Sequence, residues 1–133
     1  MKLVKLLVAT ATLTIAGAAF ANDPLLGEWV MQEDGKPKAV VTITEKGGAF
    51  TGVVTEGITP KAKKYAEDKV VVINGLKAQG DGKYSGGTIT DPRDGKEYTM
   101  SATLNGDSLT LKGGYKVPFT KTIIGKTQVW KKK

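Results

Sequence analysis

The sequence predicts an all-β protein: a single antiparallel, up-and-down barrel of eight strands with one short helix. After Ala21 the chain is rich in Thr, Val, Tyr and Ile, and Gly-containing turn signals recur roughly every ten residues. A sheet of eight short antiparallel strands would also have two edge strands that could pair with another chain. Closure into a barrel pairs these edges with each other. An open β-sandwich is the alternative fold.

The strands are recognised by apolar residues that alternate with polar ones between turn signals, except that residues 70–73 form a short apolar run, which indicates a strand buried on both faces. The expected strands are residues 26–31, 39–44, 49–55, 70–73, 83–90, 97–104, 108–112 and 126–131. Residues 46–48 and 105–107 supply glycine-containing turns. Thr59 can cap a helix and Pro60 suits its first position, so residues 59–67 are expected to be helical.

The side chains expected to face the barrel interior are aromatic and aliphatic. They are Trp29, Phe50, Tyr98, Met100, Leu104, Leu109, Leu111 and Trp130. In an up-and-down barrel the first and last strands are neighbours. We therefore expect Trp29 and Trp130 to lie close together and to fill one end of the barrel.

The first residues have the layout of a secretory signal. Two lysines precede residues 6–19, which are apolar or small, and residues 19–21, Ala-Phe-Ala, have the pattern of a signal-peptidase site. A membrane anchor is the alternative, but the apolar run is shorter than the roughly 20 residues that span a bilayer. We expect cleavage after Ala21. This leaves residues 22–133 as one β-barrel domain without a transmembrane segment, in the bacterial periplasm or outside the cell.

The charge balance is basic, with 20 Lys plus Arg against 13 Asp plus Glu and a formal net charge of +7. The excess is spread along the chain, apart from Lys61, Lys63, Lys64 and the lysines at 131–133. A spread positive charge favours approach to anionic surfaces such as lipid headgroups. Nucleic acid is not an expected partner, because the chain has few aromatic residues and no basic helix.

The densest group of charged residues lies in GGTITDPRDGKEYTM, residues 86–100. Its special residues suit a hairpin loop. Pro92 presets a backbone angle, Asp91 can accept N–H bonds within the turn, and Gly95 can take the left-handed conformation. We interpret these three as structural turn residues. A calcium site built from the acidic residues is the alternative, but their spacing lacks the alternate-ligand pattern of a calcium loop.

The chain contains no His and no Cys, which excludes several kinds of chemistry. Thiol catalysis, histidine-dependent serine triads and the usual zinc sites all need those residues. No nucleophile elbow or phosphate-binding loop is present. A hydrolase with a carboxylate pair stays open, since acidic residues are available. We expect no enzymatic activity, no metal and no cofactor.

Three motifs together resemble those of a known family. Residues 27–29 read GEW, residues 86–98 read GGTITDPRDGKEY and residues 125–130 read GKTQVW. The DUF2147 family of small exported bacterial proteins has a similar pattern, G-x-W, then GG-x-I-x-DP-x-x-GK-x-Y, then G-[RK]-TQ-x-W. The resemblance implies a calycin-like or lipocalin-like barrel in the periplasm or outside the cell, and it implies no established activity. Members often carry two cysteines where residues 45–50 here read EKGGAF, so no bridge or metal is implied there.

The predicted function is binding of a small, largely apolar ligand in the barrel interior. The candidate ligand-binding residues are Trp29, Phe50, Tyr98, Met100, Gln128 and Trp130. Gln128 alternates with Trp130 and should face the same side. A barrel of this size can instead be filled by its own side chains. The alternative function is an envelope interaction protein, without internal ligand, whose basic surface contacts an anionic partner.

Export with cleavage after Ala21 predicts a mature protein that begins at Asn22. Intact-mass measurement and N-terminal sequencing of protein isolated from its native compartment check this. A chain that begins far from Asn22, or that stays in the membrane fraction with its leader attached, would contradict the prediction.

Overall fold

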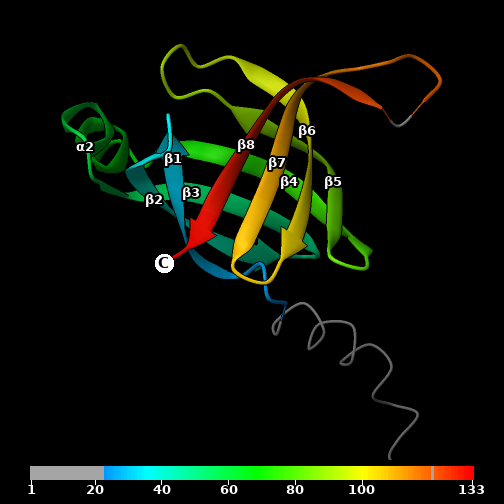
Figure 1. Cartoon of the computed structure of the whole chain (residues 1–133), viewed down its shortest axis with the longest axis horizontal. Coiled ribbons are helices and arrows are strands. Elements are labelled where there is room, and N and C mark those ends of the chain that lie inside the picture. Colours follow the sequence, from blue (N-terminus) through cyan, green and yellow to red (C-terminus); the bar gives the residue numbers. More distant parts are fainter. Residues whose placement is uncertain (1–22, 121) are drawn as a thin grey trace, which may run out of the picture.

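The structure is a closed barrel in which eight strands follow one another in sequence order (Figure 1). This computed structural model describes residues 23–120 and 122–133, so the predicted signal peptide, residues 1–21, lies outside the described residues. The elements are β1 (Gly27–Glu33), β2 (Lys36–Lys46), β3 (Ala49–Gly57), α2 (Pro60–Glu67), β4 (Val71–Gly80), β5 (Lys83–Thr90), β6 (Glu97–Asn105), β7 (Ser108–Lys116) and β8 (Ile123–Lys132).

The connections alternate between the two ends of the barrel, because all neighbouring strands are antiparallel. The end that we call closed carries the tight turns at residues 47–48, 81–82 and 106–107, together with the start of β1 and the C-terminus. The open end carries the β1–β2 turn, the α2 connection and the β5–β6 loop. It also carries the β7–β8 hairpin, which projects away from the barrel (Figure 1).

The barrel closes through a short seam between β1 and β8. Two pairs of residues face each other there, Trp29 with Lys132 and Val30 with Lys131. The Lys132 ammonium lies 4.8 Å from the ring centroid of Trp29 and donates a 2.9 Å hydrogen bond to the Leu26 carbonyl. A cation over an indole ring is a favourable contact, so these groups stabilise the junction between β1 and β8, the first and last strands of the barrel.

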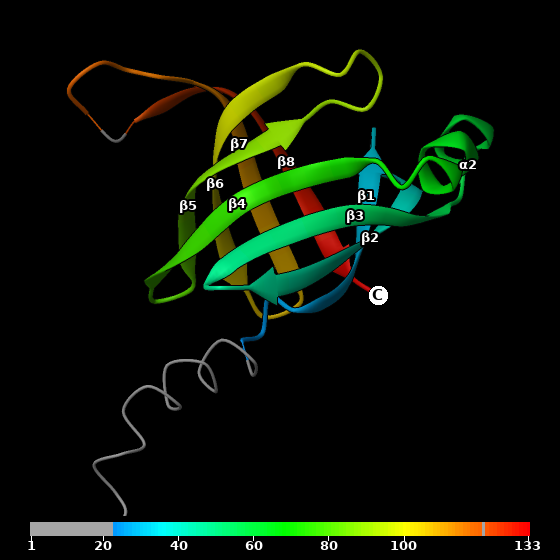
Figure 2. The ribbon, with the colours of Figure 1, turned by 180° about the vertical axis from the view of Figure 1, so that it is seen from behind.

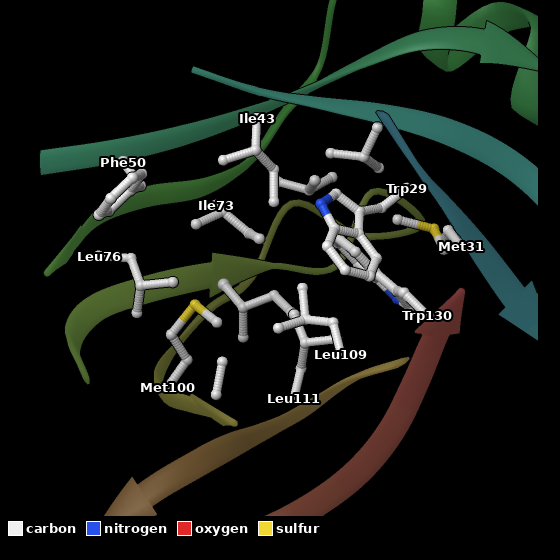
Figure 3. Close-up of a cluster of buried hydrophobic side chains, with 14 of the residues drawn as sticks. Trp29, Met31, Ile43, Phe50, Ile73, Leu76, Met100, Leu109, Leu111 and Trp130 are labelled. Carbon is white, nitrogen blue, oxygen red and sulfur yellow. The ribbon is translucent and has the colours of Figure 1, made fainter. Parts of the chain in front are cut away.

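A packed hydrophobic core fills the barrel below its open end (Figure 3). Its largest fully buried side chains are Trp29, Trp130, Phe50, Leu25, Ile43, Ile73, Leu76, Met100, Leu109 and Leu111. Trp130 lies two residues along β8 from the partner of Trp29, and both rings belong to this one cluster. Their proximity follows from the closure of the barrel.

The segment before β1 is fixed to the closed end. Leu25 is fully buried, and its carbonyl accepts a 2.9 Å hydrogen bond from the indole N–H of Trp29. The Asp23 carboxylate accepts a 2.5 Å bond from the Tyr84 hydroxyl on β5. Burial, and then the bond to Asp23, raise the pKa of Tyr84 far above its ordinary range. The hydroxyl therefore remains a donor at any physiological pH.

Helix α2 packs against the outside of β3 and β2 (Figure 2). The Thr59 hydroxyl accepts a 3.3 Å bond from the Ala62 amide, and Pro60 occupies the first turn, as the sequence predicts. A Cβ atom at Gly57 would collide with the backbone of Ala62, so only glycine lets the helix cross β3 this closely. No helix within the described residues is long and apolar enough to cross a membrane.

The predicted fold class is confirmed: the protein is an eight-stranded, up-and-down barrel rather than an open sandwich. Several predicted strand lengths were wrong. The strand predicted at 70–73 continues as β4 to Gly80, and the strand predicted at 108–112 continues as β7 to Lys116. Glycines lie at or near the start of both extensions, Gly75 in β4 and Gly113 in β7, and the backbone pairing continues beyond them.

Trp29→Phe is expected to lower the free energy of unfolding by about 2–4 kcal/mol, because it leaves the buried Leu25 carbonyl without its donor and creates a void. Urea denaturation followed by circular dichroism measures this. Val129→Ala on β8 is the control, since Val129 is 40% exposed and its truncation should cost less than about 0.5 kcal/mol. Equal losses in the two variants would contradict the prediction.

Candidate functional site

A cavity of about 500 Å³ lies at the open end of the barrel, and β1 and β8 contribute to it from the parts of these strands that do not pair. β1 provides Met31, Gln32 and Glu33, and β8 provides residues 124–128 together with Trp130. Residues of β4, β5, β6 and β7 form the other walls. The pairing of β1 with β8 ends at Val30 and Lys131, so the parts of both strands nearer the open end line the cavity without pairing with each other.

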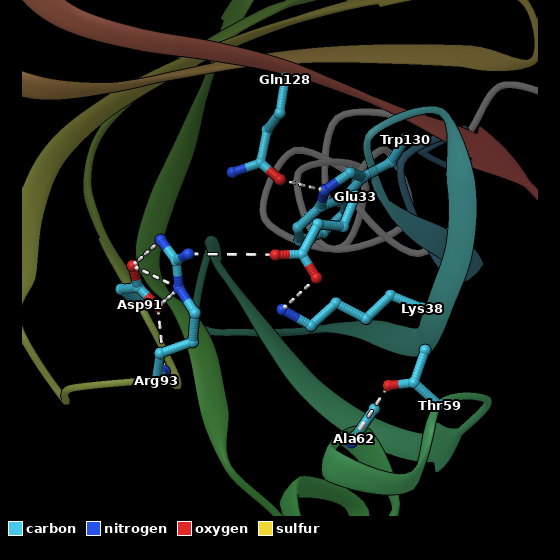
Figure 4. A network of polar contacts seen from close by, with 8 residues as sticks. All are labelled: Glu33, Lys38, Thr59, Ala62, Asp91, Arg93, Gln128 and Trp130. Atoms are coloured by element: carbon cyan, nitrogen blue, oxygen red, sulfur yellow. Dashed lines mark hydrogen bonds and ion pairs between the residues drawn. The ribbon is translucent and has the colours of Figure 1, made fainter.

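The deep part of the cavity is mainly apolar. Met31, Val72, Ile89 and Trp130 line it, and each is at least nine-tenths buried. The Trp130 indole N–H donates a 2.8 Å hydrogen bond to Oε1 of Gln128 (Figure 4). The Gln128 amide nitrogen makes no hydrogen bond to the described part of the chain, so two N–H donors remain available to a bound molecule.

An aromatic pair lines the wall formed by β6 and β7. Tyr98 and Tyr115 meet edge to face, with ring centroids 5.9 Å apart and an interplanar angle of 78°. Tyr98 is partly buried, whereas Tyr115 is 73% exposed at the upper margin of the cavity. Aromatic faces of this kind offer contact area to flat or aliphatic ligands at little cost in conformational entropy.

Four charged side chains form a chain of contacts at the cavity mouth (Figure 4). The Lys38 ammonium lies 3.4 Å from one oxygen of Glu33, and the other oxygen of Glu33 lies 3.9 Å from the Arg93 guanidinium. Arg93 in turn contacts Asp91 at 2.7 Å. The signs alternate, so this chain of charges is neutral as a whole. It links β1 and β2 to the β5–β6 loop.

The acidic members of this chain are engaged by cationic partners. Hydrogen bonds from the Arg93 side chain, opposed by partial burial, lower the pKa of the Asp91 carboxyl. A general acid at neutral pH would need a raised pKa. No group of three or more acidic side chains in the described ranges is arranged as metal ligands would be. The Asp91 carboxyl at the mouth therefore stays ionised at neutral pH and takes part in electrostatic contacts.

The β5–β6 loop has the local bonds of a tight hairpin turn. Asp91 accepts a 2.9 Å bond from the Arg93 amide, and the Gly95 amide donates to the Asp91 carbonyl at 2.8 Å. Gly95 has a φ of 77°, in the left-handed region that favours glycine. Asp91 and Pro92 also line the cavity, so two of the three predicted turn residues belong to its margin.

The structure divides the six candidate ligand-binding residues into two groups. Tyr98, Gln128 and Trp130 line the cavity. Trp29, Phe50 and Met100 do not line it; they are fully buried in the core. All six face the barrel interior as alternation requires, but they lie at different heights along its axis.

Sequence reasoning missed several residues of the cavity. Met31 and Ile89 alternate with polar residues as the six candidates do, so that signal alone could have included them, whereas Val72 lies in the continuous apolar run 70–73, where no alternation marks one face. Glu33 and Arg93 come from separate turns, and no local pattern relates them. Tyr115 and Ile124 lie on extensions of β7 and β8 that the sequence did not predict.

The Asp91–Arg93 contact predicts a measurable pH dependence. Because the pKa of Asp91 is lowered in the folded state, the contact stabilises the fold above the ordinary carboxyl pKa of about 3.9 and loses this effect as pH falls through the lowered value. Arg93→Gln should return the pKa of Asp91 toward its ordinary value. A carboxyl ¹³C NMR titration measures the pKa of Asp91 in the native protein and in the Arg93→Gln variant. Lys96→Gln in the same loop is the control. An ordinary titration of Asp91 in the native protein would contradict the prediction.

Comparison with known proteins agrees with this geometry. A solved structure, "Protein HP1028 from the human pathogen Helicobacter pylori belongs to the lipocalin family", is similar with a TM-score of 0.63 and 26% sequence identity, over 81% of this chain and 82% of that one. No curated protein matches the chain. The family described as "Uncharacterized protein conserved in bacteria (DUF2147)" matches residues 27–132. The chain therefore belongs to the DUF2147 family, and its fold is a lipocalin-like barrel.

Proposed function

We propose that this protein binds a small, largely apolar ligand in the cavity at the open end of the barrel. The cavity itself is the observation that carries the proposal. Its volume of about 500 Å³ falls within the roughly 300–1,000 Å³ typical of small-molecule sites. An apolar interior with a few polar groups that orient the ligand is also typical of such sites.

The distribution of polar groups suggests the polarity of the ligand. An apolar body would contact Met31, Ile89 and Trp130 in the deep part of the cavity. A polar group of the ligand could accept hydrogen bonds from the free N–H groups of Gln128. It could also approach the ammonium of Lys126, which lines the cavity and has no ion-pair partner in the described part of the chain. A ligand with an apolar body and one acceptor or anionic group fits this arrangement best.

The comparison with HP1028 supports the same class of function, since that protein is described as a lipocalin and eight-stranded barrels of this type can hold one small ligand. We propose further that the protein acts without catalysis. The whole chain lacks His and Cys, and the mouth carboxylates Glu33 and Asp91 are engaged in ion pairs. The leader-like residues 1–21 lead us to propose that it works in the periplasm or outside the cell.

The alternative, an envelope protein that uses its basic surface alone, finds less support in the contacts of its lysines. Lys131 donates to the Ser108 hydroxyl at 2.8 Å, Lys132 belongs to the seam, and Lys133 lies 3.2 Å from Glu56. These three side chains help to hold the barrel together. Exposed lysines on α2 remain for such contacts, chiefly Lys61 and Lys63.

Fluorescence titration with the neutral apolar probe N-phenyl-1-naphthylamine tests the cavity. We expect saturable binding that changes little with salt, because an apolar contact is not screened. Tyr98→Ala should weaken binding about tenfold, since it removes a large contact surface from the cavity wall. Trp130 emission should be quenched by the probe, because Trp130 lines the cavity whereas Trp29 does not.

Ile58→Ala is the matched control, because Ile58 is a 43% exposed apolar side chain outside the cavity. The proposal fails if the probe does not bind, or if the control weakens binding as much as Tyr98→Ala. Native mass spectrometry of protein isolated from its own compartment then identifies the natural ligand. A protein that is always found empty there, and that does not bind the probe, would favour the alternative function.

A further inference from the structure

We propose that the projecting end of the β7–β8 hairpin is a membrane-docking element, which inserts its apolar tip into an anionic phospholipid surface beside the mouth of the cavity. This element, which we call the arm, consists of residues 115–120 and 122–124. The proposal goes beyond ligand binding, and its test contains no cavity ligand, so the two proposals can fail separately.

The arm is a two-stranded ribbon that leaves the barrel (Figure 1). Pairing between β6 and β7 ends at Thr99 and Gly114, whereas pairing between β7 and β8 continues to Lys116 and Ile123. The tip is held by hydrogen bonds of its own, since the Val117 amide donates to the Thr122 carbonyl at 2.8 Å. The backbone of the arm is therefore held by hydrogen bonds of its own, and Tyr115 at its base contacts Tyr98 of the barrel.

Large apolar side chains on the arm are exposed to an unusual degree. Phe119 at the tip is fully exposed, Tyr115 is 73% exposed and Ile124 is 64% exposed. Phe119 also has a φ of 65°, a left-handed conformation that bulky residues rarely adopt. Strained backbone of this kind tends to occur at functional positions, so the orientation of Phe119 is a feature to be explained.

The exposed apolar surface is continuous with the cavity. Tyr115 and Ile124 are directly opposite each other on the paired strands, so their side chains lie on one face of the ribbon. Both residues line the cavity, and Tyr115 packs against Tyr98 deeper in its wall. The apolar lining of the cavity thus extends onto the base of the arm.

The charge of the hairpin favours an anionic partner. The sequence of residues 113–126 contains three lysines, at positions 116, 121 and 126, and no acidic residue. Basic residues beside apolar ones are typical of segments that bind anionic membrane surfaces, where each Lys adds to the attraction. A stable protein interface takes roughly 20–30 residues on each side, which is more than the arm provides. A lipid surface accepts a narrow apolar tip without that requirement.

Phe119→Trp provides a direct probe of the tip, since the native Trp29 and Trp130 are fully buried and only the introduced indole is exposed. The variant is mixed with vesicles of phosphatidylcholine, or of equal parts phosphatidylcholine and phosphatidylglycerol. With the anionic vesicles only, we expect the emission of the introduced indole to shift to the blue and to be quenched by brominated acyl chains. Binding should weaken at high salt.

Cosedimentation then compares variants of the native chain. Phe119→Ser and Lys116→Glu should each weaken binding to anionic vesicles at least fivefold, through loss of an inserted side chain and through charge repulsion. The controls are Ile58→Ser, an exposed apolar position outside the arm, and Lys83→Glu at the closed end; both should bind as the native protein does.

Three outcomes would overturn the proposal. The first is that neither vesicle is bound. The second is binding in which the emission of the introduced indole does not shift, or in which the controls lose as much affinity as the arm variants, because another surface would then be responsible. The third is concentration-dependent dimerisation in analytical ultracentrifugation that Phe119→Ser abolishes, which would assign the arm to a second copy of the chain.

Discussion

The short seam between β1 and β8 is the constraint on which the rest of the structure depends. It joins the two ends of the barrel through two facing residue pairs, and the contact of Lys132 with Trp29 strengthens it. Between the closed end and the last seam pair, Val30 with Lys131, the barrel is closed and packed with large side chains. Above it β1 and β8 do not pair with each other, and residues of both strands line the cavity.

Interior side chains near the closed end and those near the open end have different roles. Those near the closed end, such as Phe50 and Leu109, are fully buried and contribute to stability through packing. Those near the open end, such as Gln128 and Tyr98, have free surface toward the cavity. The neutral chain of charges through Glu33 and Arg93 lies at the boundary with solvent, where it connects the β1–β2 and β5–β6 turns without adding net charge to the mouth.

The cavity and the arm share the strands β7 and β8, and this arrangement gives the open end two kinds of surface. The walls formed by β4 to β7 belong to strands that pair on both sides, whereas β1 and β8 do not pair with each other at this height. The arm pairs only within itself, and three of its apolar side chains, Tyr115, Phe119 and Ile124, are exposed. Glycines mark the change: Gly114 and Gly125 face each other where the arm begins, and a Cβ atom at Gly114 would collide with the Ile124 carbonyl.

The sequence by itself determined the number and order of the strands, the capped helix and the β5–β6 turn, because these follow from local alternation and from the preferences of Pro, Gly and Thr. It also determined that Trp29 and Trp130 face inward, and closure of the barrel makes them neighbours. Only the tertiary structure decided which inward residues line the cavity. Met100 and Tyr98 are equivalent in the strand pattern, yet one is sealed in the core and the other lies on the cavity wall. Alternation specifies the face of a strand but not how the inward side chains pack at each height along the barrel, and that packing depends on residues brought together from all eight strands.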